Sequence, residues 1–216
     1  MHIDIVSDVI CPWCFIGKRR LERALALRPE LTATLSWHAF ELNPDLPSDG
    51  ISRDVYISAK FGSSPAAERL YGAVSVAGRA EGIEFAFERI RRVPNTLRAH
   101  RLIRLAADEG CAERVVEGLF RAYFLDGLDI GHTEILAELA ARSGLDQAET
   151  RRYLMGDAGA TEVRAEELRA RRLGIHAVPY FILERGYAIS GAQEAEMFLP
   201  MFDLAAGVVH PVLVEA

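Results

Sequence analysis

The sequence has few cysteines and no long hydrophobic run. Three cysteines in 216 residues are too few for a fold held together by disulfides. No stretch approaches the roughly 18 apolar residues of a membrane span, and the first residues lack the basic start and apolar core of a secretory signal. We therefore expect a cytoplasmic protein with no membrane partner, in which any disulfide is transient.

The sequence also lacks an excess of basic residues. Its 25 Lys and Arg are outnumbered by 31 Asp and Glu, which gives a formal net charge of −6. Because phosphate binding relies on many unpaired basic side chains, this balance argues against a nucleic-acid partner. Half of the residues are hydrophobic and 26% are charged, as is typical of a soluble globular protein with a substantial core.

The hydrophobic pattern divides the chain into two sheet-forming ends and a helical middle. Strands are predicted over residues 2–9, 31–42, 180–183 and 187–190, and helices after Pro12, over most of 53–173 and over 194–205. The order strand, helix, strand at the start and strand, strand, helix at the end predicts an α/β fold. We therefore expect one discontinuous domain, residues 1–45 and 174–216, with a helical domain inserted over 46–173.

The helix predicted after Pro12 has an amphipathic pattern. Leu21 and Leu25 recur with Cys14 at helical spacing, and the basic residues 18–20 occupy other faces. Pro12 suits the first turn of a helix, where its missing N–H costs nothing.

Cys11 and Cys14 stand two residues apart between the first strand and this helix. A cysteine at the first turn of a helix faces unpaired backbone N–H groups and the positive end of the helix dipole, which stabilise a thiolate. That position predicts Cys11 as a nucleophile. Cys14 lies one turn further on the core side, and is the natural thiol to resolve a mixed disulfide on Cys11.

A zinc site is the main alternative for the cysteine pair. A closed zinc site needs about four ligands, usually from two such pairs, and this chain has a single CxxC. Its histidines are isolated from one another in the sequence. The pattern therefore favours redox chemistry over a metal site or simple packing, and we assign no metal ligand.

Pro179 follows Val178 just before the predicted hairpin. A proline at the start of a strand cannot donate to the ladder, and X-Pro is the one bond type at which cis is accessible. An ordinary trans proline is the more common case at such a position, so this dipeptide gains meaning only from the motifs around it.

Together these motifs resemble the FrnE-like branch of the DsbA-type oxidoreductases, which have a thioredoxin-like fold with a large helical insertion. The resemblance covers nearly the whole chain and rests on SDVICPWCFIGKRRLE, FELNPDLP, PNTLRAHRL, GIHAVPYF and SGAQ. It implies that Cys11 is an exposed nucleophile, that Cys14 resolves, and that Pro179 is a cis-proline beside the pair. It also implies that the backbone of Val178 binds a substrate peptide or glutathione.

The same resemblance implies a thiol-disulfide oxidoreductase acting on protein or low-molecular-weight disulfides. It implies no tightly bound cofactor, with glutathione as an optional co-substrate, and it leaves the oligomeric state open, a homodimer included. The branch also holds glutathione-dependent 2-hydroxychromene-2-carboxylate isomerases and kappa-class glutathione transferases, which typically have serine in place of Cys11. An isomerase or transferase acting on an aromatic or polyketide-like molecule is therefore the alternative, and a peptide-binding holdase is a third hypothesis.

Four further residues are candidates for substrate binding. Pro12 and Trp13 lie between the two cysteines, and Asn95 and His100 lie in the basic segment RIRRVPNTLRAHRL. We expect Asn95 and His100 to line a groove opposite Cys11, although a solvated helix face paired with acids is the more common explanation for such a run of arginines.

One position departs from the related proteins. Many thioredoxin-like proteins have a buried carboxylate six residues before the first cysteine, where it accepts the proton of the resolving thiol, and here that residue is Ile5. Strand alternation places Asp4 and Asp8 on the opposite face from Ile5. Water or Glu41 therefore remains as the predicted proton acceptor for Cys14.

Overall fold

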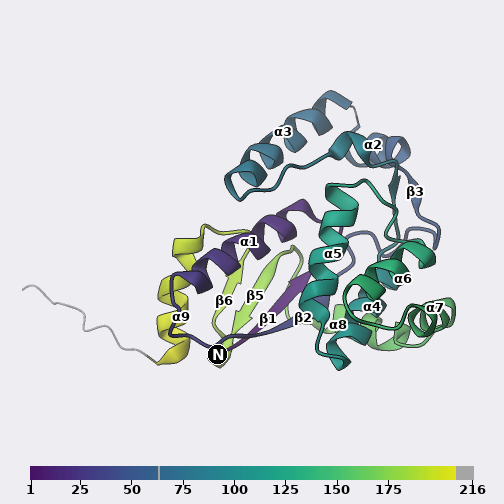
Figure 1. Ribbon diagram of the computed structural model, residues 1–216. Coiled ribbons are helices and arrows are strands. Elements are labelled where there is room, and N and C mark those ends of the chain that lie inside the picture. Colours follow the sequence, from purple (N-terminus) through teal and green to yellow (C-terminus); the bar gives the residue numbers. More distant parts are fainter. Residues whose placement is uncertain (63, 208–216) are drawn as a thin grey trace, which may run out of the picture.

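The structure is a computed structural model that describes residues 1–62 and 64–207. Figure 1 shows two parts side by side, a small sheet with helices packed against it and a larger group of helices. Within the described residues, no helix is both long enough and apolar enough to cross a membrane.

Four strands form the central sheet: β1 (His2–Ser7), β2 (Thr34–Ala39), β5 (Tyr180–Leu183) and β6 (Ala188–Ser190). Their order is β2-β1-β5-β6, with β1 parallel to β2 and antiparallel to β5, and β5 antiparallel to β6. The predicted strand-helix-strand start and the predicted hairpin are both present, which confirms the α/β fold. All four strands lie outside residues 46–173, although the division into two domains stays a prediction.

Helices α1 (Pro12–Ala26) and α9 (Phe198–Ala206) pack against the sheet (Figure 1). Ile5 and Phe181 of the sheet are buried with Phe198 of α9 in one apolar cluster. This packing explains why Ile5 stands in a strand position where a carboxylate would need a polar partner.

Several boundaries differ from the prediction, and the second strand, predicted over residues 31–42, spans only Thr34–Ala39. The first strand ends at Ser7 instead of residue 9, because the chain turns there and the Cys11 N–H donates to the Asp8 carbonyl at 3.0 Å. The last helix is preceded by a short 3-10 turn, η3 (Ala195–Met197).

The middle of the chain is mostly helical, as predicted. Its helices are α2 (Arg53–Phe61), α3 (Ser64–Ala80), α4 (Leu97–Asp108), α5 (Ala112–Phe124), α6 (Thr133–Arg142), α7 (Gln147–Met155) and α8 (Ala160–Arg172), with the 3-10 turn η1 (Phe87–Arg89). The predicted cap is present, because the Asp146 side chain accepts the Glu149 N–H at 2.8 Å. The hydrophobic pattern missed two short strands, β3 (Ile51–Ser52) and β4 (Arg92–Val93), which pair antiparallel.

The basic face of α1 is buried, unlike the exposed face that an amphipathic helix usually presents. Lys18 is only 4% exposed and its Nζ lies 2.7 Å from Glu113 and 3.2 Å from Glu117, both on α5. Arg20 is 8% exposed and pairs with Glu81 at 2.9 Å. The ion pairs explain why these side chains leave water, and they fix α1 against the helical part.

Candidate active site

Cys11 occupies the N-cap of α1. Its backbone is extended (φ −91°, ψ 112°), and Pro12 takes the first helical position. The Cys14 N–H donates to the Cys11 carbonyl at 3.0 Å, so the two cysteines stand one tight turn apart. Both are free thiols in this structure. The helix-start position predicted for Cys11 is therefore present.

Neither cysteine is freely exposed. Cys11 is 5% exposed and Cys14 is 2% exposed, both within the apolar cluster that also contains Ile10 and Phe15. The resemblance implies an exposed Cys11, and in this respect the expectation is wrong. The apolar side chains on either side of Cys11 cover it, while Trp13, 39% exposed, forms the surface of the motif.

Burial raises the pKa of the Cys14 thiol well above its ordinary value. A hydrogen bond with Cys11 and the charge on Cys11 raise it further, while the Ser7 side chain and the Asp8 backbone act in the opposite direction. Cys14 therefore holds its proton at neutral pH, and it needs a base before it can attack a mixed disulfide.

Val178 and Pro179 lie beside the dithiol. The Val178–Pro179 peptide is cis, and the Cys11 Sγ donates to the Val178 carbonyl oxygen at 3.6 Å. Gly17 of α1 packs against Pro179, because a Cβ at Gly17 would lie 2.8 Å from the Pro179 Cγ. The roles of Val178 and Pro179 in binding a substrate stay predictions.

Asp8 is buried next to the cysteine motif, a position that the sequence prediction missed. It is fully buried, and its carboxylate accepts the N–H groups of Ile10 at 3.4 Å and Leu42 at 2.7 Å. Strand alternation does not apply to Asp8, because β1 has already ended at Ser7. The sequence signal for this position was an acidic residue in the mostly apolar segment that leads to the cysteines.

His100 of α4 pairs with Asp8 inside the protein. Its Nε2 lies 3.5 Å from the Asp8 Oδ1, and its side chain is 3% exposed. Burial lowers the pKa of His100, but the hydrogen bond with Asp8 and the charges of Asp8, Glu41 and Glu166 outweigh it, and the net shift is upward. His100 is therefore an interior ion-pair partner, and it also lines a cavity of about 480 Å³ between β2 and α4. A role for His100 in substrate binding stays a prediction.

Asn95 holds a loop in place at the start of α4. Its side chain donates to the Leu46 carbonyl at 3.0 Å and accepts the Leu97 N–H at 3.0 Å. These bonds fix the segment before β3, and a role for Asn95 in substrate binding stays a prediction.

Glu41 lies just after β2 and is 3% exposed. Burial raises the pKa of its carboxyl group to about 7; His100 and Arg164 lower it, while Glu167 and Asp8 raise it. A carboxylate with this pKa can accept a proton near neutral pH. Glu41 thus stays the predicted acceptor for the Cys14 proton.

A cavity of about 180 Å³ lies beside Pro12 and Trp13. Its walls come from α1, α2, α3, η1, β4 and α5, so only the folded chain brings them together. Both residues between the cysteines, which were predicted to bind substrate, therefore border this cavity.

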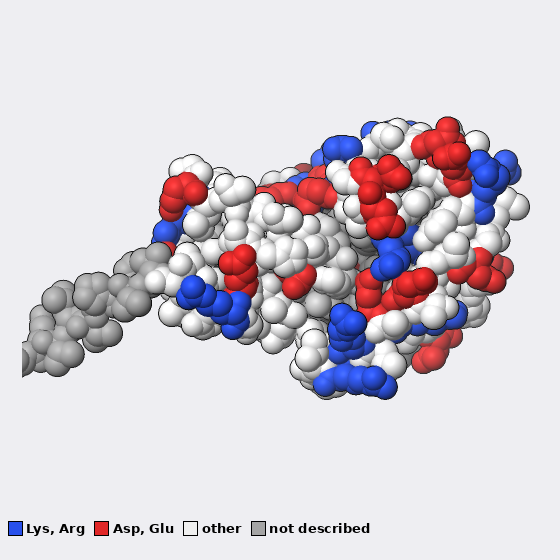
Figure 2. Space-filling view, turned by 90° about the horizontal axis from the view of Figure 1, so that it is seen from below, with Lys and Arg blue, Asp and Glu red and all other residues white. Residues whose placement is uncertain are grey.

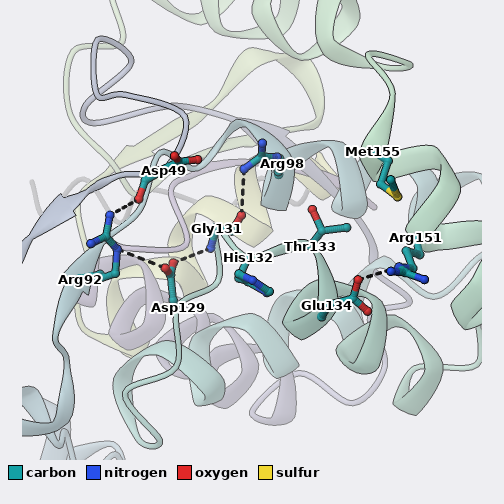
Figure 3. A pocket seen from close by; sticks show the side chains of 10 residues that line it. All are labelled: Asp49, Arg92, Arg98, Asp129, Gly131, His132, Thr133, Glu134, Arg151 and Met155. Carbon is teal, nitrogen blue, oxygen red and sulfur yellow. Dashed lines mark hydrogen bonds and ion pairs between the residues drawn. The ribbon is translucent and has the colours of Figure 1, made fainter.

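A larger cavity of about 550 Å³ lies among the helices, away from the cysteines (Figure 3). Its charged side chains already have partners: Arg92 pairs with Asp129 at 3.5 Å, and Arg151 pairs with Glu134 at 2.6 Å. Arg98 donates to the Gly131 carbonyl at 3.2 Å. Two of these arginines are paired with carboxylates, and the cavity lies away from the dithiol, so we do not assign it a function.

The described residues contain no group of three or more His, Cys, Asp or Glu side chains that could hold a metal ion. The geometry at the start of α1 instead places one thiol at a helix N-cap with a second thiol one turn behind it.

The family profile of the DsbA-like thioredoxin domain matches residues 2–202. The chain belongs to the DsbA-like thioredoxin family. It is an enzyme of this family of thiol-disulfide oxidoreductases, and the fold is the DsbA-like form that the sequence motifs predicted.

Two relatives cover nearly the whole chain. A probable DsbA oxidoreductase from Streptomyces coelicolor is 36% identical with a TM-score of 0.88, and the match covers 100% of this chain and 94% of the other. An uncharacterized protein of Bacillus subtilis (strain 168), YwbO, is 29% identical over 92% of this chain and 94% of its own.

More distant DsbA-like structures share the fold. The cytosolic disulfide reductase DsbM of Pseudomonas aeruginosa, solved with GSH, is 18% identical with a TM-score of 0.65, and 96% of each chain is covered. A 2-hydroxychromene-2-carboxylate isomerase is also 18% identical, with a TM-score of 0.70 over 96% of this chain and 95% of the other.

Proposed function

We propose that this DsbA-family enzyme exchanges disulfides with protein or low-molecular-weight partners through Cys11 and Cys14. The observation that carries the proposal is the position of Cys11: it caps α1, and its Sγ lies 3.6 Å from the carbonyl that precedes Pro179. A substrate sulfur that approaches Cys11 meets both the helix N-terminus and this stretch of backbone.

The exchange takes two displacements. The Cys11 thiolate attacks one sulfur of a substrate disulfide, the substrate S–S bond breaks, and one substrate thiolate leaves with its electron pair. Cys14 then loses its proton and attacks the Cys11 sulfur, which releases the second substrate thiolate and forms the Cys11–Cys14 disulfide. The substrate gains two electrons and the enzyme dithiol loses two, and the reverse sequence oxidises a substrate dithiol.

Glu41 would accept the proton of Cys14 in this scheme. Its carboxyl group has a pKa of about 7, within the range in which a general base works best at neutral pH. The buried Asp8–His100 pair lies next to the same motif.

Three serine variants test the dithiol. Cys11→Ser should abolish insulin reduction and exchange with glutathione disulfide, while Cys14→Ser should accumulate a mixed disulfide that intact-mass spectrometry detects. Cys111→Ser is the matched control, because Cys111 is equally buried but lies at the start of α5. Full activity in Cys11→Ser would remove the assignment.

A glutathione-dependent isomerase or transferase is the second candidate. The cavity beside Pro12 and Trp13 favours it, because this space suits a small molecule. That reaction needs only one of the two thiol positions, so its activity would survive Cys14→Ser. Loss of all activity in Cys14→Ser would exclude it.

Several features support the proposed partners and compartment. DsbM is described as cytosolic and was solved with GSH, which supports a cytoplasmic enzyme that uses glutathione as a co-substrate.

Figure 2 shows acidic and basic side chains mixed over one face of the helical part, which supports the absence of a nucleic-acid partner. A homodimer remains a proposal, which light scattering tests.

A further inference from the structure

The cavity beside the cysteine motif has aromatic walls. Trp13 lies at its edge next to Cys11, and Tyr56, Tyr71 and Phe87 line it from α2, α3 and η1. Figure 1 shows α2 and α3 above the start of α1. Its volume of about 180 Å³ lies below the roughly 300–1,000 Å³ of pockets for drug-sized ligands, so it suits a single substituted ring.

Among the residues that the structure describes, two cations are the only charged groups that line the cavity. The Arg53 guanidinium lies 4.7 Å from the centre of the Tyr71 ring and 5.9 Å from that of Phe87. The Lys60 Nζ donates to the Tyr56 hydroxyl at 2.6 Å. In the described part of the chain, neither cation has a carboxylate partner within ion-pair distance.

The arrangement of these cations follows from α2. Arg53 and Lys60 stand seven residues apart, which places both on one face of the helix. Arg53 is half-buried and Lys60 is exposed. Of the more deeply buried basic side chains, Lys18 and Arg20 have glutamate partners, whereas Arg101 donates to backbone carbonyls. A pair of uncompensated cations on aromatic walls is therefore suited to an anion from outside the chain.

Burial also raises the pKa of the Tyr71 phenol, and the Arg53 charge lowers it less than burial raises it. Tyr71 therefore remains a neutral hydrogen-bond donor, so the wall adds no negative charge that would repel an acid. The cavity combines apolar surface for a ring with a positive edge for a carboxylate.

We propose that this cavity binds the substrate of the dithiol, and that the substrate is a small aromatic disulfide that carries a carboxylate. The proposal rests on the dithiol function and names its substrate class. The ring would stack among Tyr71, Phe87 and Trp13, with the carboxylate toward Arg53 and Lys60. The displaced group is then an aromatic thiolate, released first by Cys11 and then, from the mixed disulfide, by Cys14.

Three disulfides distinguish binding of the aromatic ring from binding of the carboxylate. Dithiobis-nitrobenzoate has aromatic rings with carboxylates, dipyridyl disulfide has rings without carboxylates, and dithiodipropionate has carboxylates without rings. Stopped-flow absorbance or mass spectrometry follows their reaction with pre-reduced full-length enzyme in a single turnover. Half-saturation should occur at the lowest concentration for dithiobis-nitrobenzoate.

Variants that remove one positive charge test whether Arg53 and Lys60 bind the substrate carboxylate. Arg53→Gln should raise the half-saturation concentration for dithiobis-nitrobenzoate about tenfold, because one charge-assisted contact is lost. The half-saturation concentration for dipyridyl disulfide should change less than about twofold. Lys60→Gln should also raise the half-saturation concentration for dithiobis-nitrobenzoate. This second variant provides the test if Arg53→Gln folds poorly. Arg152→Gln is the matched control, since its side chain is 74% exposed on α7.

The outcomes separate this proposal from the proposed function. The substrate class would be overturned if all three disulfides had the same half-saturation concentration. It would also be overturned if Arg53→Gln and Lys60→Gln affected the charged and the uncharged aromatic disulfides equally. Either result would leave the dithiol chemistry intact. Failure of the enzyme to release two thiolates per chain from any disulfide would instead overturn the dithiol function.

Discussion

The Nε2 of His100 lies 3.5 Å from the Oδ1 of Asp8, with both side chains almost entirely buried. His100 belongs to α4 in the helical part, and Asp8 to the turn that leads into the cysteine motif. The pair therefore joins the two parts of the molecule directly behind the dithiol. Removing one partner leaves the other as an uncompensated buried charge, which is costly.

His100→Gln should lower the free energy of unfolding by about 2–3 kcal/mol below pH 6.5. The folded-state pKa of His100 is raised, so its stabilisation is complete below the unfolded value and is lost as pH rises through the folded value. Urea unfolding at pH 6 and pH 9 measures the difference, which should shrink at pH 9. His2→Gln, at a half-exposed surface pair, should change stability by less than about 0.5 kcal/mol. A pH-independent loss in His100→Gln would mean that the folded protein holds a neutral imidazole.

Glu41→Gln should slow the resolving step about tenfold at pH 7.5, because it removes the predicted proton acceptor of Cys14. The rate of the second thiolate release should rise through a midpoint near pH 7 in wild type and lose this midpoint in the variant. Stopped-flow release of thionitrobenzoate separates this step from the first attack by Cys11. The prediction is contradicted if the first step changes as much as the second.

The same variant should be more stable than wild type at high pH. The raised pKa of Glu41 means that the folded protein holds its proton more tightly than the unfolded chain does, so stability falls as pH rises from about 4.3 through 7. Gln carries no charge and avoids this loss, which amounts to at most about 4 kcal/mol above pH 8. Reduced activity together with increased stability at pH 8 would distinguish a functional carboxylate from a structural one.

Gly17→Ala should impair both stability and exchange. Its new Cβ would lie 2.8 Å from the Pro179 Cγ and 3.2 Å from the Phe181 Cζ, so Pro179 must shift relative to Cys11. We expect a loss of about 1–3 kcal/mol and a slower first attack. Gly118→Ala in α5 is the control, since its Cβ meets only Leu139 at 3.6 Å, and it should stabilise by about 0.5–1 kcal/mol. Equal effects in both variants would show that Pro179 tolerates displacement.

The dithiol and its strand-helix setting could be predicted because they depend on neighbours in the sequence. Cys11, Pro12 and Cys14 lie within one turn, and the strand before them and the helix after them have clear periodic patterns. Pro179 is distant from them in the sequence, and only the resemblance to a family linked it to the cysteines. Its position beside Cys11 depends on β5 lying next to β1.

The buried charges and the cavity could not be predicted, because each depends on contacts between distant segments. Asp8 was assigned to the wrong face, since the pattern extended the first strand two residues too far. His100 is half of an ion pair whose partner lies 92 residues away in the sequence, and a pattern in α4 alone resembles a solvated face. The spacing of Arg53 and Lys60 was visible, but Tyr71 and Phe87, over which Arg53 lies, come from α3 and η1.

Lys18→Met should destabilise the enzyme without altering its dithiol. Burial lowers the pKa of Lys18, but the charges of Glu113 and Glu22 outweigh it and raise the pKa overall, so the ammonium is charged across the whole neutral range. Its stabilisation is present below the unfolded value and disappears only as pH rises above about 10.5. The glutamates are partly exposed and can regain water, so we expect a loss of about 1–2 kcal/mol at pH 7 instead of the full cost of a buried pair.

Arg121→Met is the matched control for Lys18→Met. Arg121 pairs with Glu117 at 3.8 Å, but its side chain is 59% exposed, so its loss should cost less than about 0.5 kcal/mol. Urea unfolding of both variants at pH 7 makes the comparison, and thionitrobenzoate release checks that Cys11 still reacts. Equal stability of Lys18→Met and wild type would show that the desolvation cost of the ammonium cancels its attraction to the glutamates, and that packing alone holds α1 against α5.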